Sequence, residues 1–306
     1  MPATTFRRVL GNLEGLQGLE IDLIGAEPTL NPALPELVAA AAESRLRPRL
    51  FSNGTLIDRR LAGELVRAGL RQATISLDGA EPSVHDRLRG VAGAQQRALE
   101  AISHLAEVGR GSGVLVSTLT VVTRDNYEEI PAIARLARER GAVRCAFHFA
   151  SQVPEDVCRA PGVSSQYRAG GGRVLLDETD LARFRRVVRS TLQTERSVSL
   201  ALLRVLGRSA LLDGRFPVLR CRFVPTHLNL SSRGDAYPCS HLQGISWGSL
   251  AEAPWRELWA GEPRMAWIRR LRRALLPVCA FCCHHVHNLT LGQLLRVALG
   301  LPLGPM

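Results

Sequence analysis

Short apolar runs alternate with longer amphipathic stretches through the first half of the chain, and this pattern predicts its secondary structure. The runs are rich in β-branched residues and leucine, as buried strands are, and they lie at 19–25, 48–54, 72–78, 114–122 and 142–149. The stretches carry apolar residues three and four apart, as helices do, at 5–13, 33–44, 58–68, 93–108 and 127–140. Strict alternation of strand and helix requires right-handed crossovers and therefore predicts a parallel sheet.

The second half of the chain has a different pattern. Residues 151–177 are rich in Gly, Ser, Pro and Gln, with three consecutive glycines at 170–172, and we expect a mobile insertion there. Asp177 is typical of an N-cap for a helix that begins near Thr179. The expected organisation is a barrel-like domain at 1–150, the insertion at 151–177, a helical connector at 178–216 and a small carboxyl-terminal domain with its tail at 217–306.

Polar residues follow the first predicted strand. Gly25-Ala26-Glu27-Pro28 places a carboxylate between small residues at the carboxyl end of a strand, where it could bind the ammonium group of a ligand. An alternative is a helix amino terminus, with Glu27 in its first turn and Pro28 at the first helical position.

The next two strand ends are polar as well. Asn53 follows the second strand, and Ser76 and Asp78 lie two apart on the third, so both project to one side, where they could bind a ribose diol. Taken alone, Asp78-Gly79 is also typical of a turn. Three polar strand ends in succession favour a ligand site.

Composition narrows the function classes. The 306 residues are 46% hydrophobic and 22% charged, which indicates a folded chain with a sizeable core. All 39 basic residues are Arg and the net charge is +11, but the arginines are scattered, so we expect neither a nucleic acid nor a membrane as partner. Lacking a signal-like start or an apolar run of about 20 residues, the chain is expected to be cytoplasmic. The tail at 289–306 is expected to pack against the barrel, with an interfacial membrane helix as the alternative.

Seven cysteines in a cytoplasmic protein indicate metal ligands, catalytic groups or buried thiols rather than disulfides. Twelve residues separate Cys221 from Gly234 and four separate Gly234 from Cys239; Cys279 and Cys282 then form a Cys-x2-Cys pair. Four thiolates of this kind could hold an iron–sulfur cluster or zinc, to which nearby histidines could contribute as well. These histidines are His284, His285 and His287. Of the remaining cysteines, Cys145 is expected to be buried, Cys158 could contact a substrate, and Cys283 is a spare thiol beside a ligand.

The strand-end motifs resemble those of the radical S-adenosylmethionine (SAM) superfamily. Gly25-Ala26-Glu27-Pro28 is similar to its Gly-Gly-Glu-Pro motif, which holds the amino group of SAM. The segment 76–79, followed by 85–90, is similar to the ribose-side segment of members that carry a carboxyl-terminal cluster domain. The resemblance implies an α/β fold with a partial (β/α)6, TIM-like barrel lacking its first strand, and a small carboxyl-terminal iron–sulfur domain.

The carboxyl-terminal cysteines resemble the auxiliary-cluster domain called SPASM, in its shortened form called twitch. This resemblance implies one auxiliary [4Fe-4S] cluster bound by Cys221, Cys239, Cys279 and Cys282. Asn288 stands where the next cysteine of a full SPASM domain would fall, so one such cluster is expected rather than two. Four protein ligands leave no open iron position, which favours electron transfer over substrate ligation.

The sequence departs from the family at its catalytic cluster. Radical SAM enzymes bind that [4Fe-4S] cluster through Cys-x3-Cys-x2-Cys after the first strand, whereas the first cysteine here is Cys145. One explanation is a missing preceding segment that supplies the strand and a second [4Fe-4S] cluster; the other is a degenerate member. We expect the former, because the SAM-contact positions keep suitable chemistry and the strand at 19–25 would otherwise be an uncovered edge.

The resemblance implies an enzyme that cleaves SAM to a 5′-deoxyadenosyl radical and abstracts hydrogen from a peptide or small-metabolite substrate. The auxiliary cluster would transfer electrons, and flavodoxin or ferredoxin would supply them. The alternative is a non-catalytic protein that binds iron–sulfur or zinc through its carboxyl-terminal cysteines. A third hypothesis, an arginine-driven nucleic-acid binder, predicts affinity that falls steeply with salt.

Overall fold

The computed structural model describes residues 1–163, 174–195, 198–216, 220–284 and 288–299. Contacts divide the chain into two compact units. The sheet unit comprises Gly15–His148 and Arg183–Leu200, and the cysteine unit comprises Met1–Glu14, Phe149–Ala182 and Ala201–Met306. This grouping places the amino-terminal helix with the cysteine-rich half of the chain. The domain boundaries expected from the sequence stay predictions.

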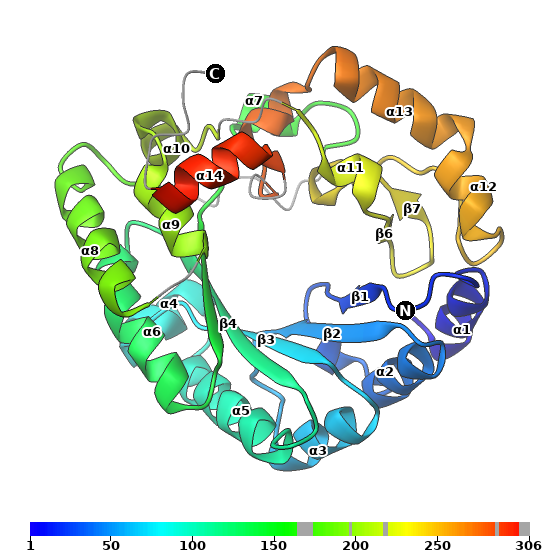
Figure 1. Cartoon of the computed structure of the whole chain (residues 1–306), viewed down its shortest axis with the longest axis horizontal. Helices are drawn as coiled ribbons and strands as arrows, with labels where there is room; N and C mark the ends of the chain where they lie inside the picture. The colour runs from blue at the N-terminus through cyan, green and yellow to red at the C-terminus, as the bar shows by residue number, and fades with distance from the viewer. Residues whose placement is uncertain (164–173, 196–197, 217–219, 285–287, 300–306) are drawn as a thin grey trace. The chain divides into compact units, whose positions relative to one another are not determined.

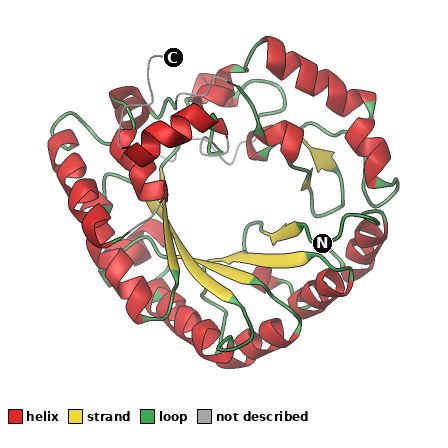
Figure 2. Ribbon diagram, in the orientation of Figure 1, coloured by secondary structure: helices red, strands yellow, loops and turns green. Residues whose placement is uncertain are grey.

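Five strands form the sheet of the sheet unit (Figure 2). They are β1 Glu20–Leu23, β2 Arg47–Ser52, β3 Gln72–Ser76, β4 Leu115–Val122 and β5 Arg144–Phe149. All five expected strands are confirmed, and the pairs from β1 to β4 are parallel. Their spatial order is their sequence order, β1-β2-β3-β4-β5. A doubly wound sheet would reverse direction at a switch point, so this order is that of a partial barrel, as expected.

Helices join the strands. They are α2 Leu34–Glu43, α3 Arg59–Arg67, α4 Pro82–Arg89, α5 Ala94–Val108 and α6 Ile130–Glu139, with α8 Leu181–Thr194 after the insertion and short 3-10 turns at η1 Pro28–Leu30 and η2 Tyr127–Glu129. The four expected connecting helices are confirmed. Helix α4 was not expected from the sequence, because it is short and buries only His85, which is too little for an apolar period.

The two faces of the sheet differ in chemistry. Leu50, Ala73 and Ile75 are fully buried on the face toward the helices, and Figure 1 shows α3, α5 and α6 along that side. The opposite face is polar: Arg49 Nε donates to Asp22 Oδ1 at 2.6 Å, and Thr74 and Ser117 hydroxyls lie 2.9 Å apart. Because its side chains are polar, this face does not form an apolar core, and the polar residues continue to the carboxyl ends of the strands. Near β1, which pairs only with β2 in the described sheet, Ile24 is 68% exposed.

The cysteine unit is built from short elements. These are α1 Ala3–Gly11, α7 Glu155–Cys158, α9 Val198–Val205, α10 Arg208–Asp213, α11 Phe223–Thr226, β6 Asn229–Leu230, β7 Ala236–Tyr237, η4 Ser240–Leu242, α12 Trp255–Ala260, α13 Glu262–Arg273, η5 Pro277–Phe281 and α14 Leu291–Leu299. Helix α1, expected at 5–13, packs Val9 against Leu250 and Leu258. Helix α8 begins at Leu181 rather than near Thr179, and Asp177 Oδ1 accepts the backbone N–H of Thr179 at 3.0 Å in the turn that precedes it.

Part of the expected insertion, 164–173 with its glycine run at 170–172, lies outside the described residues, as do 300–306 of the tail. In α14, Val297 is buried, whereas Leu291, Leu295 and Leu299 are exposed. The packing of this tail against the barrel stays a prediction. Among the described helices, none combines the length and the hydropathy needed to cross a bilayer.

Candidate functional site

Glu27 lies at the carboxyl end of β1 and connects it to the end of β2. Its Oε1 accepts the backbone N–H and the hydroxyl of Thr29, at 3.1 and 2.6 Å, and the hydroxyl of Ser52 at 2.8 Å. Its Oε2 accepts the backbone N–H of Asn53 at 2.7 Å. Glu27 is also the N-cap of the 3-10 turn η1, with Pro28 in the first turn, so the helix-start alternative is close to what the structure shows.

A count of lone pairs shows what this carboxylate can still bind. A carboxylate oxygen accepts about two hydrogen bonds, so Oε1, with three donors, is saturated and Oε2, with one, has room for another. Gly25 and Ala26 beside it are exposed, and a Cβ on Gly25 would meet nothing within 4 Å. The site is therefore a fixed, negatively charged acceptor that is open on one side, which suits a ligand's ammonium group.

The amide of Asn53 has a local role. Its Oδ1 accepts the backbone N–H and the hydroxyl of Thr55, at 2.8 and 2.7 Å, which turns the chain after β2. Its contribution to ligand binding is therefore limited to its backbone and Nδ2.

Ser76 and Asp78, the expected ribose contacts, differ in their surroundings. Ser76 is half-buried at the end of β3 on the polar face of the sheet. Asp78 is only 6% exposed; its Oδ1 accepts the backbone N–H of Val121 at 2.8 Å, and its Oδ2 pairs with Arg89 Nη2 at 2.5 Å. Because Asp78 is buried and its carboxylate is paired with Arg89, whereas Ser76 is half-buried, the geometry favours Ser76 for a ligand contact. A direct contact from Asp78 to ribose stays a prediction.

The segment 79–90 holds this strand end against α4 and α5. A Cβ on Gly79 would lie 2.6 Å from the backbone N of His85, so the close approach requires glycine. Asp86 accepts the backbone N–H groups of Gln95 and Gly93, at 2.9 and 2.6 Å, which lowers its pKa and caps α5. The charged residues of this motif thus have structural partners.

His85 is buried and neutral in the fold. Its Nδ1 accepts the backbone N–H of Asp78 at 3.1 Å, and burial lowers its pKa, with Arg89 acting in the same direction and Asp78 opposing. Since the unfolded chain binds this proton more readily, the contribution of His85 to the free energy of unfolding is complete above pH about 6.5 and falls as the pH drops below that value.

We expect His85→Gln to reduce this loss of stability at acidic pH, which for one proton is at most about 1.4 kcal/mol per pH unit. Urea midpoints at pH 7.5 and 5.5 measure it; equal losses in both proteins would contradict the assignment.

The four predicted cysteine ligands come from three segments of the cysteine unit. Cys221 precedes α11, Cys239 follows the β6–β7 hairpin, and Cys279 and Cys282 lie in and just after η5. Gly234 lies in the hairpin turn at φ 94°, where a Cβ would also crowd Ala251 at 3.1 Å. Cys221 and Cys279 pack against one apolar cluster that contains Trp247, and Cys239 packs against another that contains Phe281.

These thiols are half-buried and act on one another. Burial, together with the charges of Cys283, Cys279 and Cys221, raises the pKa of Cys239 to about 12. Burial likewise raises the pKa of Cys279 to about 11 and raises those of Cys282 and Cys221. Neighbouring half-buried thiolates repel one another, and the positive charge of a metal or cluster offsets this repulsion. The donor set therefore fits an iron–sulfur cluster chemically. Within the described ranges, no group of three or more His, Cys, Asp or Glu is arranged to hold a metal ion directly.

Three polar residues stabilise the loops of this region, although the sequence analysis did not identify them as functional. Asn288 Nδ2 donates to Cys282 Sγ at 3.4 Å. His241 is buried, and its Nε2 accepts the backbone N–H of Cys283 at 3.3 Å. Arg264 is 2% exposed and donates to the carbonyl oxygens of Val224 and Pro225, just after the Cys221 segment. No sequence pattern indicates them, because their partners lie 39 or more positions away or depend on a loop conformation.

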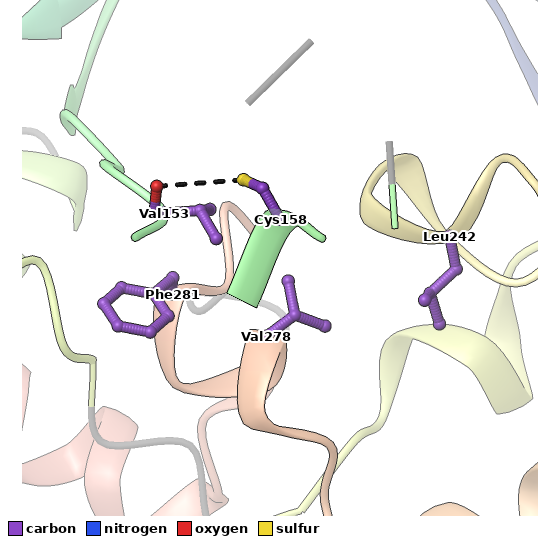
Figure 3. Packing of buried hydrophobic residues seen from close by; sticks show 5 residues of the cluster. All are labelled: Val153, Cys158, Leu242, Val278 and Phe281. Atoms are coloured by element: carbon purple, nitrogen blue, oxygen red, sulfur yellow. Dashed lines mark hydrogen bonds between the residues drawn. The ribbon is translucent and has the colours of Figure 1, made fainter. Parts of the chain in front are cut away.

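The remaining cysteines have different surroundings. Cys145 is buried, as expected, with its Sγ 3.9 Å from the carbonyl oxygen of Ala134. Figure 3 shows the side chain of Cys158 directed toward the carbonyl oxygen of Val153, at 3.8 Å, among apolar neighbours. Burial of Cys158 disfavours the substrate contact considered for it. Cys283 lies close enough to raise the pKa of Cys239 and Cys282.

The histidines that follow are only partly described. His284 Nε2 lies 2.8 Å from Ser240 Oγ, and its ring stacks on Phe223 at 3.8 Å. His285 and His287, considered as further ligands, lie outside the described residues.

Comparison with known proteins matches the two parts of the chain to two families. Residues 2–137 match the radical SAM superfamily, and residues 221–292 match SPASM, an iron–sulfur cluster-binding domain. An AdoMet-dependent heme synthase of Methanosarcina barkeri is 30% identical over 250 residues, which are 78% of this chain and 67% of that protein. A PqqA peptide cyclase of Granulibacter bethesdensis is 30% identical over 138 residues, 45% of this chain and 36% of that protein.

Among solved structures, SuiB of Streptococcus suis bound to its precursor peptide SuiA has the same fold, with a TM-score of 0.64 and 20% identity. The match covers 88% of this chain and 60% of SuiB. The chain thus spans between about a third and two thirds of the length of these three proteins. Iron–sulfur clusters and SAM are the cofactors of the two matched families. The chain belongs to the radical SAM superfamily and carries a carboxyl-terminal SPASM-type iron–sulfur cluster-binding domain.

Proposed function

We propose that the chain binds SAM at the carboxyl ends of β1–β3 and one auxiliary [4Fe-4S] cluster in the cysteine unit, as parts of a radical SAM enzyme. The observation that carries the SAM site is the carboxylate of Glu27, fixed by four hydrogen bonds and left with one accepting position on Oε2. In this assignment Oε2 accepts the ammonium group of SAM, and Gly25 and Ala26 leave its approach open. The hydroxyl of Ser76 forms a hydrogen bond with a ribose hydroxyl, as donor or acceptor.

Asp78 acts on this site through position rather than by contact. Its pair with Arg89 and its bond from Val121 hold the end of β3 against β4 and α4, so that Ser76 keeps its place. A catalytic cluster that holds SAM and receives one electron from the donor would supply a 5′-deoxyadenosyl radical, with methionine released, for hydrogen abstraction from the substrate. The cysteines that would hold such a cluster are not among the residues of this sequence.

In the cysteine unit, Cys221, Cys239, Cys279 and Cys282 are the proposed ligands of the auxiliary cluster. Trp247 shields Cys221 and Cys279 from water, since it packs in the same apolar cluster and is 5% exposed. Trp255 instead bonds to the carbonyl oxygen of Glu14, and Trp259 stacks on Arg264. Because four thiolate ligands leave no open iron position, the proposed role of the cluster is electron transfer.

The proposed substrate is a peptide or a small metabolite. PqqA peptide cyclase and peptide-bound SuiB support the first, and the AdoMet-dependent heme synthase supports the second. A flavodoxin or ferredoxin is the proposed electron donor.

Glu27→Gln tests the SAM site. We expect SAM to bind about 10 to 100-fold more weakly, because charge-assisted hydrogen bonds contribute about 1.5–3 kcal/mol and the amide cannot accept the ammonium group at the Oε2 position. Titration calorimetry of the purified chain with SAM measures the affinity. Glu43→Gln, an exposed residue of α2, is the matched control. Equal affinity of the wild type and Glu27→Gln, with both folded by circular dichroism, would remove Glu27 from the site.

A further inference from the structure

Asn288 is only 4% exposed, and each polar atom of its side chain forms a hydrogen bond within the protein. Its Oδ1 accepts the backbone N–H groups of Arg222 and Phe223, at 2.7 and 3.2 Å, and its Nδ2 donates to Cys282 Sγ at 3.4 Å. The orientation of the amide follows from its partners, because two backbone N–H donors require the oxygen on their side. The NH₂ group must therefore face the sulfur.

These bonds connect two of the three segments that carry the cysteines. Arg222 and Phe223 directly follow Cys221, while the sulfur belongs to Cys282, 61 positions further along the chain. A single buried amide thus holds the Cys221 segment beside the Cys-x2-Cys segment. The Cys239 segment joins the same region through a different bond, from the backbone N–H of Cys283 to His241 Nε2 at 3.3 Å.

A donor to a ligand sulfur also has an electronic consequence. An N–H···S bond withdraws electron density from a thiolate, so it stabilises the more negative, reduced form of an attached cluster. Asn288 itself is neutral and supplies its oxygen to the backbone, so it does not compete for iron. Burial strengthens the effect, because water cannot replace the lost donor.

We propose that Asn288 is a positioning residue of the auxiliary cluster, which holds the Cys221 and Cys282 segments together and raises the cluster's reduction potential through its bond to Cys282 Sγ. This inference rests on the proposed assignment of Cys282 as a cluster ligand. It is distinct from that assignment, because four thiolates can bind the cluster without Asn288.

Asn288→Leu removes both kinds of bond at nearly constant volume. In anaerobically reconstituted protein we expect about four irons to remain and the auxiliary cluster to become harder to reduce. At a fixed potential the ratio of reduced to oxidised cluster should fall about tenfold, which for one electron is about 59 mV. Potentiometric titration followed by electron paramagnetic resonance measures this. Thermal melting of the metal-free variant should show a lower midpoint than the wild type, since the loops lose their bridge.

Asn229→Leu is the matched control. Asn229 Nδ2 donates to the carbonyl oxygen of Pro238, next to Cys239, and no bond from it to sulfur is found among the described residues. We expect Asn229→Leu to lower the melting midpoint without moving the potential. An equal shift of potential in both variants would overturn the inference, because general loosening would explain it.

A third variant, Asn288→Asp, separates the bonds to the backbone from the bond to sulfur. Asn288→Asp keeps an oxygen for Arg222 and Phe223 but no N–H for sulfur, so we expect a melting midpoint above that of Asn288→Leu and a potential below that of the wild type. An unchanged potential in iron-loaded Asn288→Leu or Asn288→Asp overturns the proposal. Wild-type protein without iron would instead overturn the cluster assignment, and the electronic effect with it, while metal-free melting still decides whether Asn288 bridges the two segments.

Discussion

Replacing both Cys279 and Cys282 with alanine is expected to abolish the iron that the anaerobically reconstituted chain binds, from about four atoms per chain to none. The two residues form the Cys-x2-Cys pair, and burial raises the pKa of both half-buried thiols, which lie near Cys239. Two remaining thiolates from two different segments cannot hold a four-iron cluster. Iron and sulfide analysis measures the loss.

Cys145→Ala is the matched control for this experiment. Cys145 is buried in the sheet unit, where its sulfur faces the carbonyl oxygen of Ala134, so its removal should leave the iron content unchanged. Wild-type protein that contains zinc and no iron would contradict the cluster assignment. It would favour the non-catalytic alternative considered from the sequence.

Asp78→Ala is expected to lower the free energy of unfolding by about 2–3 kcal/mol, somewhat less than the loss of one partner from a fully buried ion pair. Asp78 is 6% exposed, and its removal leaves Arg89, which is partly exposed, and the backbone N–H of Val121 without their acceptor. Urea unfolding of the chain measures the change. The same variant should weaken SAM binding only indirectly, through the position of Ser76.

Asp125→Ala is the control, because Asp125 is an exposed carboxylate on the loop that follows β4. Its substitution should change stability by less than about 0.5 kcal/mol. If Asp78→Ala unfolds like the wild type but loses SAM affinity, then Asp78 contacts the ligand directly, and the ribose role expected from the sequence is correct. Loss of stability with little loss of affinity supports the positioning role.

The strands were predictable because each carries β-branched or leucine residues that are buried on the helix side, as Leu50 and Ile75 show. Helix α4 was not, since its eight residues bury one histidine and its amino terminus reads as a turn after Asp78-Gly79. The placement of α1 with the cysteine unit was also unforeseen. Its apolar face indicates that Val9 is buried but does not indicate which partner covers it, and Leu250 and Leu258 come from the far end of the chain.

The candidate site shows the same division. The cysteines were identifiable because four thiols in these spacings have few structural explanations, and Glu27 because polar residues follow three strands in succession. Asn288, His241 and Arg264 were not, because an amide, an imidazole and a guanidinium are common in cores and acquire a role only through their partners. The sequence suggested that Asp78 faces a ligand, since it could not show that this carboxylate is buried and bonded to Arg89 and Val121.

By itself, the sequence determined the alternation of strands and helices, the family motifs at 25–28 and 76–79, and the set of carboxyl-terminal thiols, because these depend on local composition and spacing. Only the tertiary structure decided which of these polar atoms stay accessible. Glu27 keeps an accepting position beside the exposed Gly25 and Ala26, whereas Asp78 is buried with Arg89 and the backbone of Val121 as partners. Asn288 reaches sulfur because two distant loops meet at its amide. Hydrogen-bond capacity is short-ranged and saturable, so it is assigned when the chain folds and cannot be read from residue order.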